Sequence, residues 1–185
     1  MAKQLYDYWF VQFDFPNEEG KPYKSSGGEM VWNEKLKRKI PNEWDNCKLK
    51  DFINLFDSKR IPLSSKDREE RKGNYPYYGA TGIMDYVNEY IFDGDYLLVS
   101  EDGNNLVARS TPIAFSISGK NWVNNHAHVL KFDCYATRRY VEFYLNAIDL
   151  SQFISGGAQP KLNQKNLNTI PIALPAINCL LYTSD

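Results

Sequence analysis

The chain has 185 residues, 43% of them hydrophobic, so its length and composition suit one globular domain with an additional arm. A formal net charge of −1 and an isoelectric point of about 6.1 argue against a simple basic nucleic-acid-binding module, whose isoelectric point usually exceeds about 9. The chain shows no apolar run near the roughly 20 residues of a membrane span, its N-terminus is unlike a signal peptide, and its three cysteines are widely spaced, which predicts a protein of the reducing cytoplasm without a disulfide framework or zinc ribbon.

The first twelve residues predict the end of a helix that is apolar around most of its circumference. Its apolar side chains are Leu5, Tyr8, Trp9, Phe10 and Val11. Such a helix should be buried against another helix or another subunit, and Pro16 should end it. A turn-rich loop follows over residues 17–28, and residues 35–40 predict one basic helical turn.

The middle of the chain predicts a β-rich body. Residues 47–56 suit either a strand or a short helix, because Leu49, Phe52 and Phe56 have helical spacing. Residues 58–74 predict a charged loop. Aromatic and β-branched runs punctuated by glycines then predict strands at about 75–79, 82–87, 90–92, 95–100, 106–109, 112–117, 121–124 and 127–132.

The last third predicts two helices separated by a loop. An amphipathic helix should run from Arg138 to Asn146. A loop containing Gly156 and Gly157 follows, then a short helix over residues 164–167 capped by Asn163, and a final strand.

Charge is unevenly distributed along the sequence. Residues 85–102 carry six carboxylates and no Lys or Arg, whereas residues 35–50 and 59–72 are rich in Lys and Arg. One acidic face and one basic face is the simplest arrangement, with the acidic segment turned away from phosphates or toward a protein partner. A solvated surface of mixed charge is the alternative.

Residue patterns for catalysis are weak. His126 and His128 alternate on a predicted strand and should share a face, which is how a two-histidine metal site could begin. A third ligand is not specified, so buried, hydrogen-bonded histidines are favoured. Glu19-Gly20-Lys21 has the Glu-x-Lys form of some nuclease sites, at arbitrary spacing from any acid. Phosphate-cradling and dinucleotide-binding glycine motifs are absent from the sequence. We therefore predict no catalytic and no metal-binding residues.

Five blocks carry the strongest signal. They are AKQLYDYWFVQFDFP at 2–16, YPYYGATGIMDYV at 75–87, YIFDGDYLLVSEDGN at 90–104, WVNNHAHVL at 122–130, and SGGAQPKLNQKNL at 155–167 followed by IPIALP at 170–175. In this order the blocks resemble the target recognition domain of specificity subunits from type I restriction-modification systems.

That resemblance implies an α/β (α+β) fold: a β-rich target recognition domain with a curved, mostly antiparallel sheet, peripheral helices and an N-terminal helical arm. Residues 1–41 would be the end of a spacer helix with a connecting arm, and residues 42–175 the recognition domain. The family usually continues into a long helix, so residues 176–185 predict an atypical or truncated tail.

The resemblance also implies sequence-specific binding of double-stranded DNA, as a specificity subunit or half-subunit acting in bacterial defence. Modification subunits would methylate adenine, and through them a restriction and motor subunit would cleave DNA; S-adenosylmethionine, Mg²⁺ and ATP would serve those partners, and this chain would need no cofactor. A homodimer is one assembly to consider. The alternative is a non-catalytic interaction or anti-restriction module that binds modification subunits without reading DNA. The acidic segment and the apolar N-terminus motivate it.

Candidate DNA contacts lie in predicted loops. They are Lys59, Arg60, Lys72, Tyr77, Tyr78, Asn104, Asn105, Arg109, Gln159, Lys161, Gln164 and Lys165. Gln suits an adenine edge, and Lys suits phosphate or guanine. The competing roles are cross-strand packing for the tyrosines, turn formation for the asparagines, and a solvated surface for the basic residues.

Overall fold

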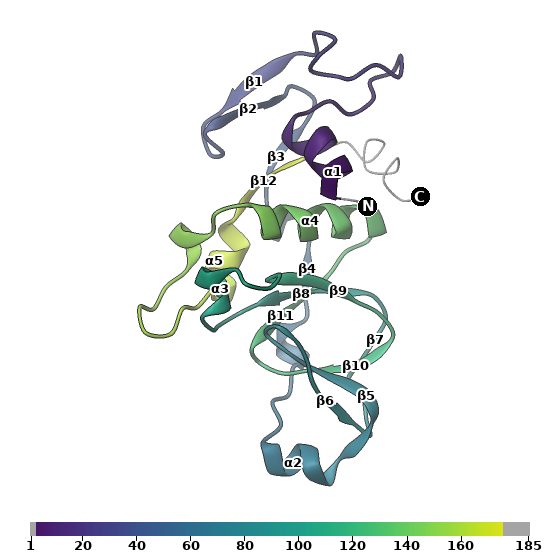
Figure 1. Ribbon diagram of the computed structural model, residues 1–185, viewed down its shortest axis with the longest axis vertical. Coiled ribbons are helices and arrows are strands. Elements are labelled where there is room, and N and C mark those ends of the chain that lie inside the picture. The colour runs from purple at the N-terminus through teal and green to yellow at the C-terminus, as the bar shows by residue number, and fades with distance from the viewer. Residues whose placement is uncertain (1–2, 176–185) are drawn as a thin grey trace.

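The computed structural model describes residues 3–175, so the atypical or truncated tail predicted at 176–185 lies outside the described residues. The molecule is elongated, with an N-terminal hairpin at the top of Figure 1, helices across the middle and the β-rich body below. None of the helices in this range has the length and apolar character that crossing a membrane requires.

The N-terminal arm is helical and packs on the chain's own long helix. α1 (Lys3–Tyr6) continues directly into a π-helical turn, η1 (Asp7–Val11). Tyr6 stacks on Phe143 of helix α4 (Tyr135–Ala147), with ring centroids 5.2 Å apart. The predicted helix is therefore present and covered by another helix, but it ends several residues before Pro16.

A two-stranded hairpin follows the arm. β1 (Met30–Asn33) pairs antiparallel with β2 (Arg38–Pro41). The basic helical turn predicted for residues 35–40 is wrong, because the side chain of Asn33 accepts hydrogen bonds from the backbone N–H groups of Lys35 and Leu36 and so builds a tight turn.

Two four-stranded sheets form the body. The first has the order β4 (Asn54–Leu55), β11 (Ala127–Lys131), β8 (Tyr96–Ser100), β9 (Ala114–Ile117), and is antiparallel throughout. The second has the order β6 (Gly82–Val87), β5 (Lys72–Gly79), β10 (Lys120–Val123), β7 (Phe92–Asp93), in which only the β5–β10 pair is parallel. The mostly antiparallel α+β class predicted from the sequence is confirmed.

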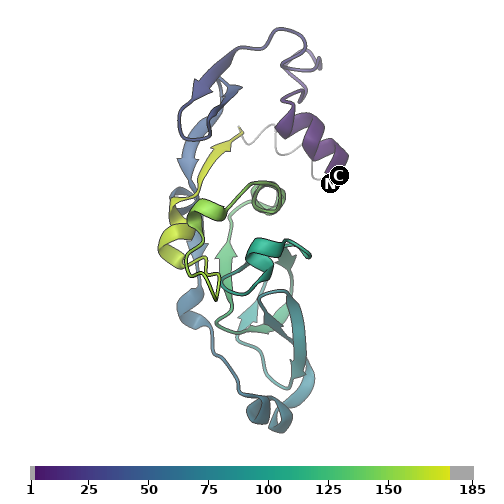
Figure 2. The ribbon, with the colours of Figure 1, turned by 60° about the vertical axis from the view of Figure 1, so that its left-hand side comes forward.

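The C-terminal strand β12 (Pro171–Leu174) pairs antiparallel with β3 (Asp45–Lys48). Buried Leu97 and Leu130 of the first sheet join Leu145 of α4 and Ile172 of β12 in one hydrophobic cluster. This cluster fixes the first sheet, the long helix and the C-terminal segment relative to one another, and Figure 2 shows the helix end-on beside the sheets.

Short helices occupy the connections. They are η2 (Leu49–Asp51), η3 (Asp57–Lys59), α2 (Ser65–Glu70), α3 (Asn105–Ala108), η4 (Ser151–Phe153) and α5 (Gln164–Thr169). The Asn163 side chain accepts a hydrogen bond from the Asn166 N–H at 2.9 Å, which is the predicted cap of α5. The strand predicted at 106–109 is wrong, since these residues belong to α3 and its C-cap.

Candidate nucleic-acid interface

Two segments far apart in the sequence are joined through their backbones. The Leu162 N–H donates to the Glu101 carbonyl at 2.7 Å, and the Gly103 N–H donates to the Pro160 carbonyl at 3.0 Å. These bonds hold the loop of residues 155–162 against the segment 101–105 that follows β8. The candidate residues Gln159, Lys161 and Asn104 are thereby brought to one part of the surface, and all three are exposed.

Two further loops reach the same place. The Glu101 N–H donates to the His126 carbonyl at 2.8 Å, and the Ser100 hydroxyl donates to the Ala80 carbonyl at 2.6 Å. The β5–β6 turn at 79–82 and the segment 124–126 therefore adjoin the other two. We call the four loops 79–82, 101–105, 124–126 and 155–162 the four-loop surface.

The loop 155–162 is closed by its own backbone. The N–H groups of Ser155 and Lys161 each donate to the carbonyl of the other, at 2.8 and 2.7 Å. Gly156 has a φ of +82°, and a Cβ there would meet the Gln159 carbonyl oxygen at 2.4 Å. The turn therefore requires glycine at position 156.

A buried ionic network lies beneath this loop. Arg60 Nη1 is 2.7 Å from Glu101 Oε2 and 2.7 Å from the Ala127 carbonyl. Lys161 Nζ is 3.2 Å from Glu101 Oε1. His128, with a fully buried side chain, lies 2.6 Å from Asp57 Oδ2. The network joins η3 and the residue after it, the segment that follows β8, β11 and the loop 155–162.

His128 has a hydrogen-bonding partner on each side of its ring. Nδ1 faces the Asp57 carboxylate at 2.6 Å, and Nε2 faces the Leu162 carbonyl at 2.7 Å. The buried ring therefore bridges η3 and the end of the loop 155–162, with Asp57 on one side and Leu162 on the other.

The two carboxylates of the network are ionised. Burial raises the pKa of Asp57, but hydrogen bonding and charge from His128, with Arg60, bring that pKa below its ordinary value. Burial likewise raises the pKa of Glu101, and Arg60, His128 and Lys161 together bring it below its ordinary value.

Asp57, Glu101 and His128 are also residue types that bind metals, and one ligand atom of each lies within 4.8 Å of the others. The Arg60 guanidinium already faces oxygens of both carboxylates. Its positive charge would oppose a metal cation, so the geometry fits an ion-pair network better than a metal site.

His126 differs from the prediction of a buried histidine. Its side chain is 49% exposed, and Nδ1 lies 2.8 Å from Asp102 Oδ1. It precedes the first residue of β11, so it lies on the four-loop surface rather than in the sheet. Sequence reasoning missed His126 and Asp102 as surface polar groups there.

Tyr77 does not offer an aromatic face to DNA. Its side chain is 1% exposed, its hydroxyl accepts a hydrogen bond from the Leu63 N–H at 2.9 Å, and Arg68 covers its ring. Tyr78 is half-buried and packs on Phe115. Cross-strand packing, the competing role, accounts for both residues.

Two arginines predicted to bind phosphate have internal roles instead. Arg60 belongs to the ionic network, and its side chain is 12% exposed. Arg109 donates to the carbonyls of Leu145 and Ile148 at the end of α4, at 3.1 and 2.9 Å. Their guanidinium groups are occupied by these partners.

The other candidates remain on the surface. The Asn105 side chain holds a turn by bonding the backbone of Thr111, and Lys72 pairs with Asp85 at 2.8 Å. Lys59 is exposed above the Phe56 ring. Gln164 and Lys165 are exposed in the first turn of α5, directly after the four-loop surface.

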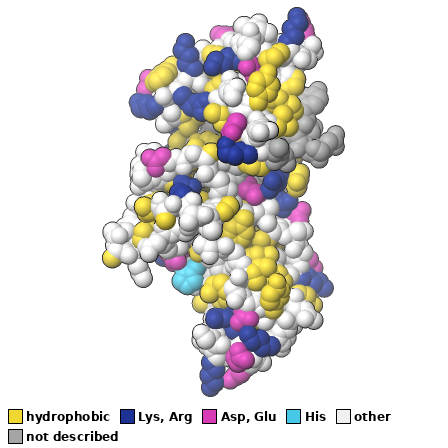
Figure 3. All heavy atoms as spheres, viewed as in Figure 1, with side chains coloured by type: hydrophobic (Ala, Val, Ile, Leu, Met, Phe, Trp, Pro, Cys, Tyr) yellow, Lys and Arg dark blue, Asp and Glu magenta, His cyan; other side chains and the backbone are white. Residues whose placement is uncertain are grey.

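Basic side chains lie beside the acidic segment. Three of its carboxylates are paired: Asp85 with Lys72, Glu89 with Arg71, and Asp95 with Arg138. On the face shown in Figure 3, basic and acidic side chains are interspersed. That face has the mixed charge of the alternative interpretation rather than a single sign of charge.

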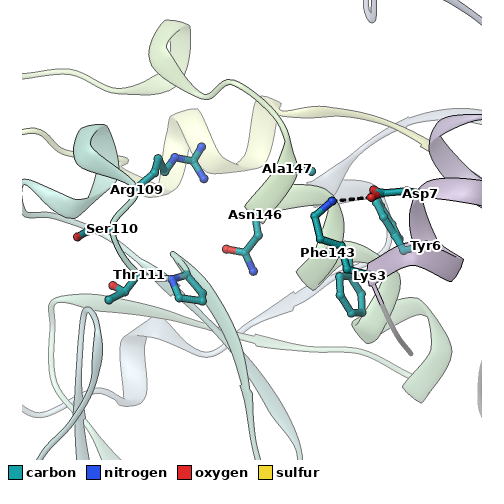
Figure 4. A pocket seen from close by; sticks show the side chains of 10 residues that line it. Lys3, Tyr6, Asp7, Arg109, Ser110, Thr111, Phe143, Asn146 and Ala147 are labelled. Carbon is teal, nitrogen blue, oxygen red and sulfur yellow. Dashed lines mark hydrogen bonds and ion pairs between the residues drawn. The ribbon is translucent and has the colours of Figure 1, made fainter.

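A cavity of about 380 Å³ lies away from these loops, between α1, α4 and residues 109–112. Figure 4 shows the Lys3–Asp7 ion pair at one side and Asn146 between that pair and Arg109. Lys3 and Asp7 neutralise each other, and Arg109 is bound to α4. The cavity thus presents no arrangement of groups suited to acid–base catalysis among the residues that line it.

The sequence is similar to one family model and to curated proteins. The family model described as "Type I restriction modification DNA specificity domain" matches residues 41–178. A candidate type I restriction enzyme specificity subunit of Haemophilus influenzae is 34% identical over 145 residues, covering 78% of this chain and 36% of that protein. The type I restriction enzyme EcoprrI specificity subunit of Escherichia coli is 29% identical over 118 residues, covering 63% of this chain and 28% of that protein.

Solved structures share the fold. A chain from a study of complex assembly and conformational transition of the type I R-M system matches with a TM-score of 0.59 at 14% identity, over 97% of this chain and 42% of that one. The HsdS subunit of Thermoanaerobacter tengcongensis matches with a TM-score of 0.51 at 16% identity, over 97% and 41%. The chain spans about a third of the length of the curated relatives it matches.

Proposed function

This chain belongs to the type I restriction modification DNA specificity family, and on that premise we propose that it recognises a specific sequence in double-stranded DNA. The four-loop surface would enter a groove of the duplex. Gln159 would bond a base edge, while Lys161, Lys165 and Lys59 would contact phosphates or guanine.

The observation that carries this proposal is the backbone anchoring of the loop 155–162 to segment 101–105. Base discrimination needs polar groups held in one geometry before DNA arrives, because ordering them on binding costs free energy. Here the polar side chains of Gln159, Lys161 and Asn104 project from a backbone that is already hydrogen-bonded.

We further propose that the chain is non-catalytic and works in the cytoplasm. Modification subunits would methylate adenine with S-adenosylmethionine, and a restriction and motor subunit would use ATP and Mg²⁺. This chain would direct them to their site, alone or as two copies that supply two half-sites. The anti-restriction alternative depends in part on an apolar arm that could bind a modification subunit. Because α1 and η1 pack on α4 of the same chain, the arm gives that alternative less support than expected.

Selection from a pool of random duplex oligonucleotides tests the proposal. We expect the purified chain to enrich one sequence, and we expect its affinity to fall as salt rises because phosphate contacts release counterions. A variant combining Gln159→Ala with Lys161→Gln should enrich nothing while keeping the wild-type melting temperature. Equal binding of all duplexes by the wild-type chain would refute the proposal, and association with a modification subunit under those conditions would favour the alternative.

A further inference from the structure

Glu101 contacts three basic side chains from separate parts of the chain, those of Arg60, His128 and Lys161. Its Oε1 is 3.2 Å from Lys161 Nζ, and its Oε2 is 2.7 Å from Arg60 Nη1 and 3.7 Å from His128 Nδ1. The Glu101 side chain is 12% exposed, whereas that of Lys161 is 49% exposed. The carboxylate is therefore inside the protein, and it reaches outward only to the Lys161 ammonium.

The backbone of Glu101 joins the same loops. Its N–H donates to the His126 carbonyl at 2.8 Å, and its carbonyl accepts from the Leu162 N–H at 2.7 Å. One residue thus fixes segment 124–126, the end of loop 155–162 and the head of Lys161. Arg60 and His128 hold the carboxylate from its inner side, so it cannot follow Lys161 into solvent.

We propose that Glu101 is a positioning residue for DNA recognition, which holds the Lys161 ammonium at one place on the four-loop surface. The inference rests on the proposed function and names the group through which one lysine gains sequence discrimination. An unanchored lysine is a mobile point charge that favours any phosphate, since its four-carbon stem has many rotamers.

Anchoring leaves Lys161 able to bind DNA. An ammonium has three N–H donors, and the contact with Glu101 engages one side of the group. The carboxylates of the network are paired with cations, Asp57 with Arg60 and Glu101 with both Arg60 and Lys161, so they present no unpaired negative charge to a phosphate. A hydrogen-bond acceptor on a base edge can therefore pair with an N–H group of Lys161 whose position is fixed.

A double-mutant cycle tests whether Glu101 acts through Lys161. Glu101→Gln is made in the wild-type chain and in Lys161→Gln, and affinity is measured for the selected duplex and for a random duplex. In the wild-type background we expect the ratio of the affinity for the selected duplex to that for the random duplex to fall about tenfold, because one good base contact is lost. For the random duplex we expect the slope of log affinity against log salt concentration to become steeper by up to about 1, because the released ammonium contacts phosphate.

In the Lys161→Gln background, Glu101→Gln should change that ratio less than about twofold, since coupled residues are non-additive. An equal loss in both backgrounds would mean that Glu101 only supports the fold, and would overturn the inference. Glu89→Gln, which removes an exposed ion pair with Arg71, is the matched control and should leave both quantities unchanged.

A second variant covers the case in which Glu101→Gln does not fold. Lys161→Arg keeps the charge on a half-exposed side chain but moves its donors. We expect the affinity ratio to fall at least about fivefold with the salt dependence unchanged; an unchanged ratio would overturn the inference. If the wild-type chain selects no sequence, the proposed function fails and the inference fails with it. If it does select one and these variants keep the preference, the inference alone fails.

Discussion

A Cβ atom on Gly156 would lie 2.4 Å from the carbonyl oxygen of Gln159. The backbone of the loop 155–162 therefore passes so close to itself that position 156 has no room for a side chain. Its positive φ of +82° adds to this requirement. The path of the loop, and so the presentation of Gln159, depends on this glycine.

Gly156→Ala should accordingly destabilise the protein by about 1–3 kcal/mol and weaken binding to the selected duplex. The change forces both a left-handed alanine and a backbone clash. Gly157→Ala is the control, because a Cβ there meets nothing within 4 Å, and it should change the free energy of unfolding by less than about 0.5 kcal/mol. Chemical denaturation of the two variants checks this, and equal losses would contradict the described loop.

Gln159→Ala should relax sequence preference at one base position, and it should weaken binding to the selected duplex by about 1–3 kcal/mol.

Lys165→Gln should instead weaken binding to every duplex and reduce the slope of log affinity against log salt concentration by about 1. Binding titrations at several salt concentrations distinguish the two effects. Lys39→Gln, in the hairpin at the top of Figure 1, should change neither, and a uniform loss across sequences in Gln159→Ala would contradict base contact by Gln159.

Arg109→Lys should lower thermal stability without changing the salt dependence of DNA binding. The guanidinium donates to two carbonyls at the end of α4, and an ammonium at that position cannot reproduce the fork. A loss of about 1 kcal/mol would lower the Tm by about 2–4 °C. The opposite result, an unchanged Tm with a reduced salt dependence of DNA binding, would indicate that Arg109 contacts phosphate.

Asp57→Asn should destabilise the protein at neutral pH by an amount on the order of 3 kcal/mol, because it removes the carboxylate that pairs with the largely buried Arg60 side chain and contacts the His128 ring. The folded-state pKa of Asp57 lies below its ordinary value. Its contribution is therefore fully present above the unfolded pKa of about 3.9 and is lost as pH falls through the lower folded value.

Unfolding free energies between pH 2 and 7 measure this dependence. The difference between wild type and Asp57→Asn should narrow at the acid end of this range, where the wild-type carboxyl also becomes neutral. Asp133→Asn serves as a control, because its side chain is exposed and has no hydrogen bond or ion pair within residues 3–175, and the substitution should leave the free energy of unfolding unchanged across this range. A constant difference across the whole range would show that Asp57 does not act through its charge.

Local patterns predicted those parts of the fold that depend on near neighbours in the sequence. The periodicity of residues 138–146 identified the core of α4, and Asn163 marked the start of α5. The short apolar run Leu106-Val107-Ala108 suits a strand as well as a helix, because three residues cannot distinguish a buried strand from one helical turn.

The site was harder to predict, since its contacts join distant residues. Arg60 and Glu101 are 41 residues apart and His128 and Leu162 are 34 apart, and neither pair has a local sequence signal. The aromatic run predicts a strand at 75–79, but nothing local to it shows that Tyr77 is buried beneath the Arg68 side chain. By contrast, the glycines and the exposed Gln159 of the loop 155–162 were evident from the sequence.

The loop 155–162 is held by main-chain atoms and by Leu162, whose side chain is fully buried, while Ala158 and Gln159 point to solvent. Replacing those two exposed side chains by others would leave the main-chain hydrogen bonds of the loop intact. Such a scaffold lends itself to the evolution of new target sites by point substitution, and it gives protein engineers two adjacent positions for randomisation in a search for altered DNA preferences.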